Sequence, residues 1–235
     1  MPRSPQFAGH VVICCRVPHT TSHADATRWQ AEVASRGVPV TWSVTPESLE
    51  TWLEICGTPS AIAVQIGNAR ANGSLQREEI RSGLRHAAGR LSAAVVHNDR
   101  PLDHRGLFVE GGIEIVATHR LHAVGRQSRR PPPAGWDCRC LQWGLWEAGF
   151  SSPRRRLFGL IEDRRPQTGR LTLLETGCGE QDRPEAGLAK LRQTLLQVEA
   201  AVRSNGVRAS LLADLPRQLH GGLAADDRGS ILAAA

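Results

Sequence analysis

Four residues that could bind a metal or transfer protons follow apolar, β-rich runs of this chain. His97 ends the run AAVVH and Asp99 comes two positions later, while His119 follows IEIVAT and Glu175 follows LTLL. Imidazole nitrogens and carboxylate oxygens are ligands that Zn²⁺ and Mn²⁺ accept. We therefore predict His97, Asp99 and His119 as candidate metal ligands. Asp99 and Glu175 are candidate catalytic carboxylates. The alternative is a set of hydrogen-bonded loop residues, because no spacing among the four is diagnostic.

Two other patterns resemble parts of a metal site. Cys138 and Cys140 are separated by one residue, but neither a second cysteine pair nor a histidine pair follows them, as a zinc site would require. The segment HTTSH places His19 and His23 four residues apart. With 9 histidines in the chain, such a pair arises easily by chance. We interpret HTTSH as the loop that leads into a helix.

Tryptophans gather in an arginine-rich part of the chain, with Trp136, Trp143 and Trp146 close together. Tryptophan faces stack on sugar rings, and arginines pair with acidic groups. We therefore predict that Trp143 and Trp146 are substrate-binding residues of a carbohydrate-binding lip. Stacking on nucleobases is the alternative. Tyrosine is absent and phenylalanine occurs only 4 times, so we expect nucleic acid not to be a partner.

The elements that must position these residues alternate between strands and helices. Apolar, β-rich runs predict strands over 11–17, 38–44, 61–66, 93–97, 113–118, 171–174 and 207–212, with strand-like runs at 141–146 and 157–161. Helical spacing of apolar residues predicts helices after Ser22, Thr45, Ser74 and Asp182, and short helices at 104–109 and 215–219. This alternation implies right-handed βαβ crossovers and a parallel sheet or barrel.

The regular pattern fails between residues 119 and 170, where prolines and arginines cluster. A stretch of this kind is usually functional or disordered. We expect a single domain over 9–219 with an irregular insertion at about 119–170, followed by a flexible tail at 220–235.

Composition is that of a soluble globular protein, with 40% hydrophobic and 22% charged residues. No apolar run approaches the roughly 20 residues of a transmembrane helix, and no signal-peptide pattern is present, so we expect no membrane partner and a cytoplasmic location. The 6 cysteines lack the spacing of a disulfide framework and are expected to be free thiols there. The net charge of +6 comes almost wholly from arginine, with Lys190 the single lysine.

The order and spacing of the elements resemble the polysaccharide deacetylase family with a NodB-homology domain. The resemblance runs from about residue 11 to residue 219. One stretch that carries it is GVPVTWSV, which is similar to the family's GvkATFFv. The others are SAIAVQIG, REEIRSGLRHAAGRL, and RLTLLETG together with the helix and strand that follow it. It implies an α/β fold, a distorted or incomplete (β/α) barrel with its site at the C-terminal ends of the strands. Family members typically hold a divalent metal with one Asp and two His, and use an Asp as general base and a His as general acid.

The chain departs from the family at each motif. CRV, with Arg16 in its middle, stands where paired aspartates should end the first strand, and QIGNA, beginning at Gln65, stands in place of His-x-x-x-His. The closing LLLHD reads LLET. An Arg-Pro pair remains at Arg100, whereas RPPPAG at 130–135 follows the fifth strand and is displaced. These positions make Arg16, Gln65 and Arg100 candidate substrate-binding residues.

Three functions follow from these observations, and whether the chain is an enzyme stays open among them. The leading hypothesis is a protein without standard deacetylase activity, and without a cofactor, that binds a saccharide or a protein partner. The alternative is a metal-dependent hydrolase of amide C–N bonds in N-acetylated saccharides, holding zinc or manganese with relocated ligands. The third is an adaptor whose basic segment 126–165 contacts acidic partners.

Overall fold

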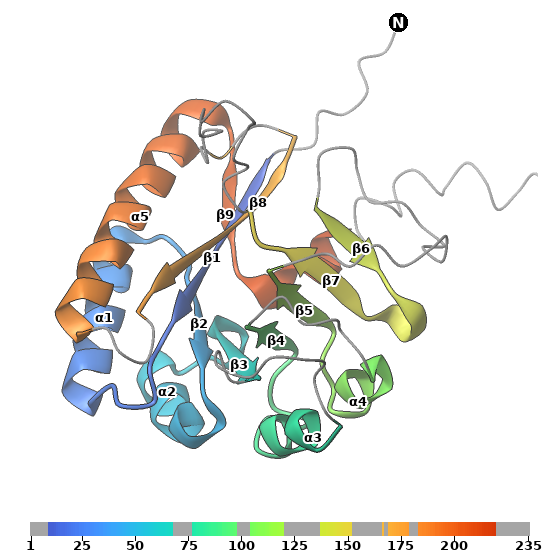
Figure 1. Ribbon diagram of the computed structural model, residues 1–235. Helices are drawn as coiled ribbons and strands as arrows, with labels where there is room; N and C mark the ends of the chain where they lie inside the picture. The colour runs from blue at the N-terminus through green and yellow to red at the C-terminus, as the bar shows by residue number, and fades with distance from the viewer. Residues whose placement is uncertain are drawn as a thin grey trace, which may run out of the picture.

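The apolar run VVICC forms the middle of the first strand of a nearly closed barrel (Figure 1). The computed structural model describes residues 9–67, 77–97, 104–119, 137–151, 166, 169–178 and 183–219. The strands are β1 (His10–Arg16), β2 (Thr41–Val44), β3 (Ile62–Ile66), β4 (Ala93–Val96), β5 (Ile115–Thr118), β6 (Cys138–Cys140), β7 (Trp146–Gly149), β8 (Leu171–Gly177) and β9 (Arg208–Ser210). Neighbouring strands pair in parallel, except for the antiparallel hairpin of β6 and β7.

The order of the strands shows how the barrel closes. Along the sheet the order is β6-β7-β5-β4-β3-β2-β1-β8, while β9 pairs with the first residues of β1. Ser151, just after β7, donates its backbone N–H to the carbonyl of Leu173 in β8 at 2.8 Å. The hydroxyl of Ser151 accepts from the N–H of Leu173 at 3.1 Å. These two bonds join the far ends of the sheet, and the expected incomplete (β/α) barrel is confirmed.

Alternate residues of each strand face the barrel interior and the surrounding helices. Along β1, Val12 and Cys14 pack with the side chains of the interior, whereas Val11, Ile13 and Cys15 pack with side chains of the helices. Both faces of the strand are therefore buried. This is why its sequence is continuously apolar instead of alternating between apolar and polar residues.

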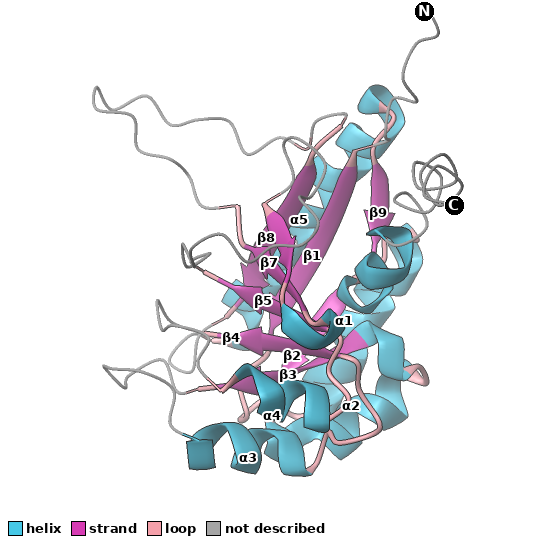
Figure 2. Ribbon diagram, turned by 90° about the vertical axis from the view of Figure 1, so that its right-hand side faces the viewer, coloured by secondary structure: helices cyan, strands magenta, loops and turns pink. Residues whose placement is uncertain are grey.

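Helices cover the outside of the barrel (Figures 1 and 2). They are α1 (His23–Arg36), α2 (Leu49–Cys56), α3 (Arg77–Arg85), α4 (Arg105–Glu110) and α5 (Pro184–Asn205). The predicted start of α1 is confirmed, because the Ser22 hydroxyl accepts from the N–H of Asp25 at 3.1 Å. The helix ends at Gly37, which has the left-handed φ of 65° that glycine adopts most easily.

The segment 212–219 closes the end of the barrel at which the parallel strands begin. Leu212, Leu215 and Leu219 belong to the same buried cluster as the interior side chains of the strands. The hydroxyl of Thr41, at the start of β2, accepts from the backbone N–H of Leu212 at 2.9 Å. The interior is thus filled at this end, and the opposite end is where polar side chains gather.

The region around the tryptophans differs from the prediction. A strand was expected over 141–146, but a turn at Gln142–Gly144 separates β6 from β7. Trp143 has a φ of 60° and Gly144 one of 80°, and such positive values break an extended strand. The strand-like run at 157–161 and the tail at 220–235 lie outside the described residues, as does most of the segment 119–170. None of the helices in the described residues is both long and apolar enough to cross a membrane.

Ion pairs connect α1 to α5 on the outside of the barrel. The Glu32 carboxylate accepts from Arg36 at 2.9 Å and from Arg192 of α5 at 2.8 Å. Arg36 also lies 3.4 Å from a carboxylate oxygen of Glu199 in α5. The side chain of Glu32 is only 15% exposed, so solvent screens it less than an ordinary surface carboxylate.

Replacing Glu32 by glutamine should lower the free energy of unfolding by about 1 kcal/mol, because this carboxylate accepts hydrogen bonds from arginines on two helices. Hydrogen bonds from Arg192 and Arg36 hold the pKa of Glu32 below its usual value. Its contribution should therefore be present above the ordinary glutamate pKa and disappear as the pH falls through the lowered value. Urea denaturation measures the change, with Glu54→Gln on the exposed face of α2 as the control. Equal losses in the two variants would contradict this role for Glu32.

Candidate metal centre

The interior-facing positions at the carboxyl ends of the strands carry polar side chains. Arg16 continues the interior face of β1, and Gln65 continues that of β3. By the same alternation His97, His119 and Glu175 follow the interior residues of β4, β5 and β8. Parallel strands all end at one rim of the barrel, so residues far apart in sequence meet there.

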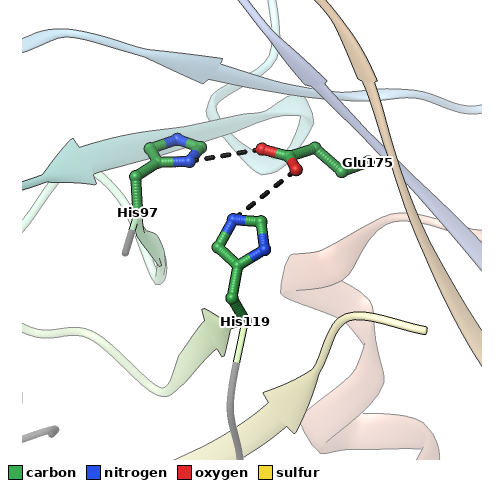
Figure 3. Close-up of side chains that lie close together, drawn as sticks. All are labelled: His97, His119 and Glu175. Carbon is green, nitrogen blue, oxygen red and sulfur yellow. Dashed lines mark ion pairs between the residues drawn. The ribbon is translucent and has the colours of Figure 1, made fainter. Parts of the chain in front are cut away.

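His97, His119 and Glu175 converge at this rim (Figure 3). His97 Nδ1 lies 3.3 Å from Glu175 Oε1, and His119 Nε2 lies 3.5 Å from Glu175 Oε2. One ligand atom from each residue falls within 4.8 Å of the other two. Within the described part of the chain, this is the one group of three or more His, Cys, Asp or Glu side chains close enough to share a metal ion.

One ring nitrogen of His97 contacts the neighbouring strand β2, and the other ring nitrogen faces Glu175. Its side chain is 2% exposed. Nε2 lies 3.2 Å from the hydroxyl of Ser43 in β2, and the Gln65 amide donates to the Ser43 carbonyl at 2.9 Å. Nδ1 is buried and has no hydrogen bond of good geometry to any described residue. A buried nitrogen without such a bond is costly unless something else occupies its lone pair.

The ring of His119 is positioned by aromatic packing. Its centroid lies 4.7 Å from that of Phe150, the residue after β7, and 5.9 Å from that of His97. His119 is 27% exposed, and Glu175 is 31% exposed. The cluster is therefore buried at His97 and open to solvent at the other two side chains. A small molecule can therefore reach the cluster from solvent at His119 and Glu175.

The protonation states of the cluster suit a cation. Burial lowers the pKa of His97, although the neighbouring Glu175 opposes this shift, so the imidazole is neutral at neutral pH. Burial alone would raise the pKa of Glu175, but the hydrogen-bonding contacts with His119 and His97 outweigh it and hold that pKa well below its usual range. Neutral imidazole and ionised carboxylate are the forms that bind metal.

The donor set fits a divalent transition metal. Two imidazole nitrogens and a carboxylate are the ligands of many zinc sites, and they leave further coordination positions open. The bond from His97 Nε2 to Ser43 fixes the ring so that Nδ1 points toward Glu175. Outer hydrogen bonds of this kind commonly orient the histidines of metal sites.

The structure brings together three of the residues singled out from sequence. Asp99 and Arg100 lie outside the described residues. Arg16 and Gln65 lie at the same rim as the cluster, with Gln65 bonded to the β2 backbone.

Trp143 and Trp146 do not form a lip at this rim, and Trp136 lies outside the described residues. Trp146 is 1% exposed and packs inside the barrel, so no sugar can stack on its ring. Trp143 is 68% exposed, but it precedes β7, and the register with β5 places it at the end of the barrel opposite to His119. Burial thus excludes sugar stacking on Trp146, while sugar binding by Trp143 stays a prediction for a place away from the candidate site.

Sequence reasoning overlooked Ser43. In VPVTWSV, the small polar residues Thr41 and Ser43 alternate with apolar ones, and this is the signal of a polar stripe on one face of a buried strand. The two patterns that resemble metal sites stay apart from the cluster. His19 and His23 are exposed, and Cys138 and Cys140 lie on β6.

Comparison with known proteins supports the architecture alone. No protein-family model matches the chain, and no curated protein matches its sequence. The crystal structure of a protein classed as a polysaccharide deacetylase, from Mycobacterium smegmatis, superposes with a TM-score of 0.55 at 12% identity, covering 94% of this chain and 93% of that one. The peptidoglycan deacetylase PdaC from Bacillus subtilis gives a TM-score of 0.47 at 9% identity, covering 96% and 98% of the two chains. The superposition on the Mycobacterium smegmatis structure thus confirms the resemblance for the fold, and this chain has the same type of α/β barrel.

Proposed function

We propose that this protein is a metal-dependent hydrolase of amide C–N bonds in N-acetylated saccharides. The observation that carries the proposal is the convergence of His97, His119 and Glu175 at the carboxyl rim of the barrel. This favours the hydrolase over the binding scaffold that the missing family motifs suggested, because two imidazoles and a carboxylate that face one another at an open rim are a metal-binding donor set, which a scaffold does not need. The substrate class follows from the fold shared with a polysaccharide deacetylase.

His97 Nδ1, His119 Nε2 and a Glu175 oxygen would hold the ion, with zinc or manganese as the metals that suit these donors. When bound, the ion polarises the acyl carbonyl and lowers the pKa of water. Ser43 orients His97, and the partly exposed side of Glu175 and His119 gives access to substrate. Asp99, two residues after His97, is our candidate for the general base.

The reaction is a simple hydrolysis. The oxygen of water bonds to the acyl carbon, the C–N bond breaks, and the nitrogen takes up a proton. The products are acetate and a free amino sugar. A base near the water and an acid near the leaving nitrogen are the two proton-transfer roles that this chain must supply.

Metal retention tests the site directly. Protein dialysed against a weak chelator should keep about one equivalent of zinc or manganese, as expected for a three-donor site. His97→Ala and Glu175→Gln should lose it, because each removes one of three donors. His23→Ala, an exposed histidine on α1, is the matched control and should keep the metal. Elemental analysis measures the content, and circular dichroism establishes that each variant is folded. Unchanged metal content in both folded site variants would rule out this centre.

Removing the hydroxyl of Ser43 should weaken metal binding without abolishing it. Loss of an outer hydrogen bond to a ligating histidine typically costs about 10- to 100-fold in affinity, so Ser43→Ala should show a zinc Kd raised by at least about tenfold. Competition with a chromophoric chelator gives the Kd. Ser35→Ala, on the outside of α1, is the control. The same Kd in Ser43→Ala and the wild type would show that the contact does not orient His97.

Acetate release tests the reaction. The metal-loaded protein should release acetate from N-acetylated oligosaccharides, and Glu175→Gln should reduce the rate by at least about 100-fold, since the carboxylate contributes to binding the ion. A coupled acetate assay measures the rate, and isothermal titration calorimetry follows binding in parallel. If the sugars bind and the metal-loaded wild type releases no acetate, the proposal fails and the binding scaffold replaces it.

A further inference from the structure

Arg16 lies at the same rim of the barrel as the candidate metal centre. Val12 and Cys14 face the barrel interior, so Arg16, two positions further along β1, faces the same way at the rim. Glu175 also faces the interior from the adjacent strand β8, where Cys14 is its register partner. Arg16 therefore lies one interior position further toward the carboxyl ends of the strands than Glu175, on the same face of neighbouring strands.

The two register partners of Arg16 carry no charge. Its partner on β2 is Ser43, a small residue, and its partner on β8 is Gly177, which has no side chain. Gly177 cannot be replaced easily, because a Cβ there would lie 2.2 Å from the backbone oxygen of Arg16. Its φ of 94° also favours glycine. Neither neighbouring position on the interior face therefore offers Arg16 an acidic partner.

Arg16 is a half-buried cation without a carboxylate partner among the described residues. Several other arginines have one: Arg36 pairs with Glu32, Arg90 with Glu50, and Arg139 with the buried Glu147. Glu175 could have filled this role for Arg16, but its oxygens face His97 and His119 (Figure 3). The positive charge of Arg16 is nevertheless felt in the site, because it adds to burial, the main cause, in lowering the pKa of His97.

The charge of the rim follows from these placements. Glu175 is the one carboxylate that the described strands contribute to this rim. A bound divalent ion would more than neutralise its charge. Arg16 adds another positive charge. An open rim with excess positive charge attracts anions, and the planar guanidinium matches carboxylate and phosphate groups in particular.

We propose that Arg16 is a specificity-determining residue that binds an anionic group of the substrate, so that the preferred substrates are N-acetylated sugars carrying a carboxylate or a phosphate. This inference rests on the proposed function, because it concerns the same site. It does not depend on the identity of the metal. The anion would lie at the rim against the Arg16 guanidinium, while the acetamide group lies toward His97, His119 and Glu175.

Three matched sugars test the preference by calorimetry. N-acetylglucosamine, its 6-phosphate and N-acetylglucosaminuronate differ only at carbon 6, which carries a neutral hydroxyl group, a phosphate or a carboxylate. The wild type should bind at least one anionic sugar tenfold or more tightly than the neutral one, and comparison of the two anions distinguishes phosphate from carboxylate. Arg16→Gln should reduce the preference to less than twofold, and Arg16→Lys should retain part of it. Arg208→Gln, the same charge change at the opposite end of the barrel, is the matched control and should keep the full preference.

Equal affinities for the three sugars in the wild type would overturn the proposal, as would an anion preference that survives in Arg16→Gln. Binding is measured with and without metal, and this separates the inference from the proposed function. If the protein retains no metal and releases no acetate, the hydrolase fails, while an Arg16-dependent preference in the metal-free protein still supports the anion subsite. If metal and acetate release are present without the preference, only the subsite fails.

Discussion

The parallel pairing of strands whose two faces are both buried is the constraint on which this structure depends. A strand such as β1 has one face against the barrel interior and the other against helices. Apolar side chains must therefore occupy nearly every position, and polar groups fit only where the strands end. Because all of the parallel strands end at the same rim, this single requirement collects Arg16, Ser43, Gln65, His97 and Glu175 in one place.

Burial and chemistry are coupled at this rim. His97 is almost completely buried and neutral, while its neighbour Glu175 is ionised and partly open to solvent. In a low-dielectric environment a nitrogen lone pair and a carboxylate that face one another attract positive charge strongly. A cation at this place would interact with both Nδ1 of His97 and the Glu175 carboxylate, which lie 3.3 Å apart.

The sequence predicted much of the fold and the central part of the site, and the errors have a common cause. The strands and helix ends were predictable because continuous apolar runs and capping residues are local signals. His97, His119 and Glu175 were predictable as a group because each lies near the carboxyl end of a parallel strand. The contact of Ser43 with His97, and the burial of Trp146, depend on register and on which face a side chain occupies. Those are properties of pairing between distant segments, and local periodicity does not contain them.

The pairing of β1 also has a consequence for how the protein is made. β1 pairs with β2 and with two strands from the far end of the described chain, β8 and β9. The segment 212–219, which closes the barrel interior, comes later still in the sequence. During synthesis the apolar run VVICC leaves the ribosome well before its partners β8 and β9, which lie far along the chain. Contacts between such distant segments slow folding and leave apolar strands exposed in the meantime. The edge of β1 that pairs with β8 and β9 therefore stays open to aggregation until those two strands have also emerged.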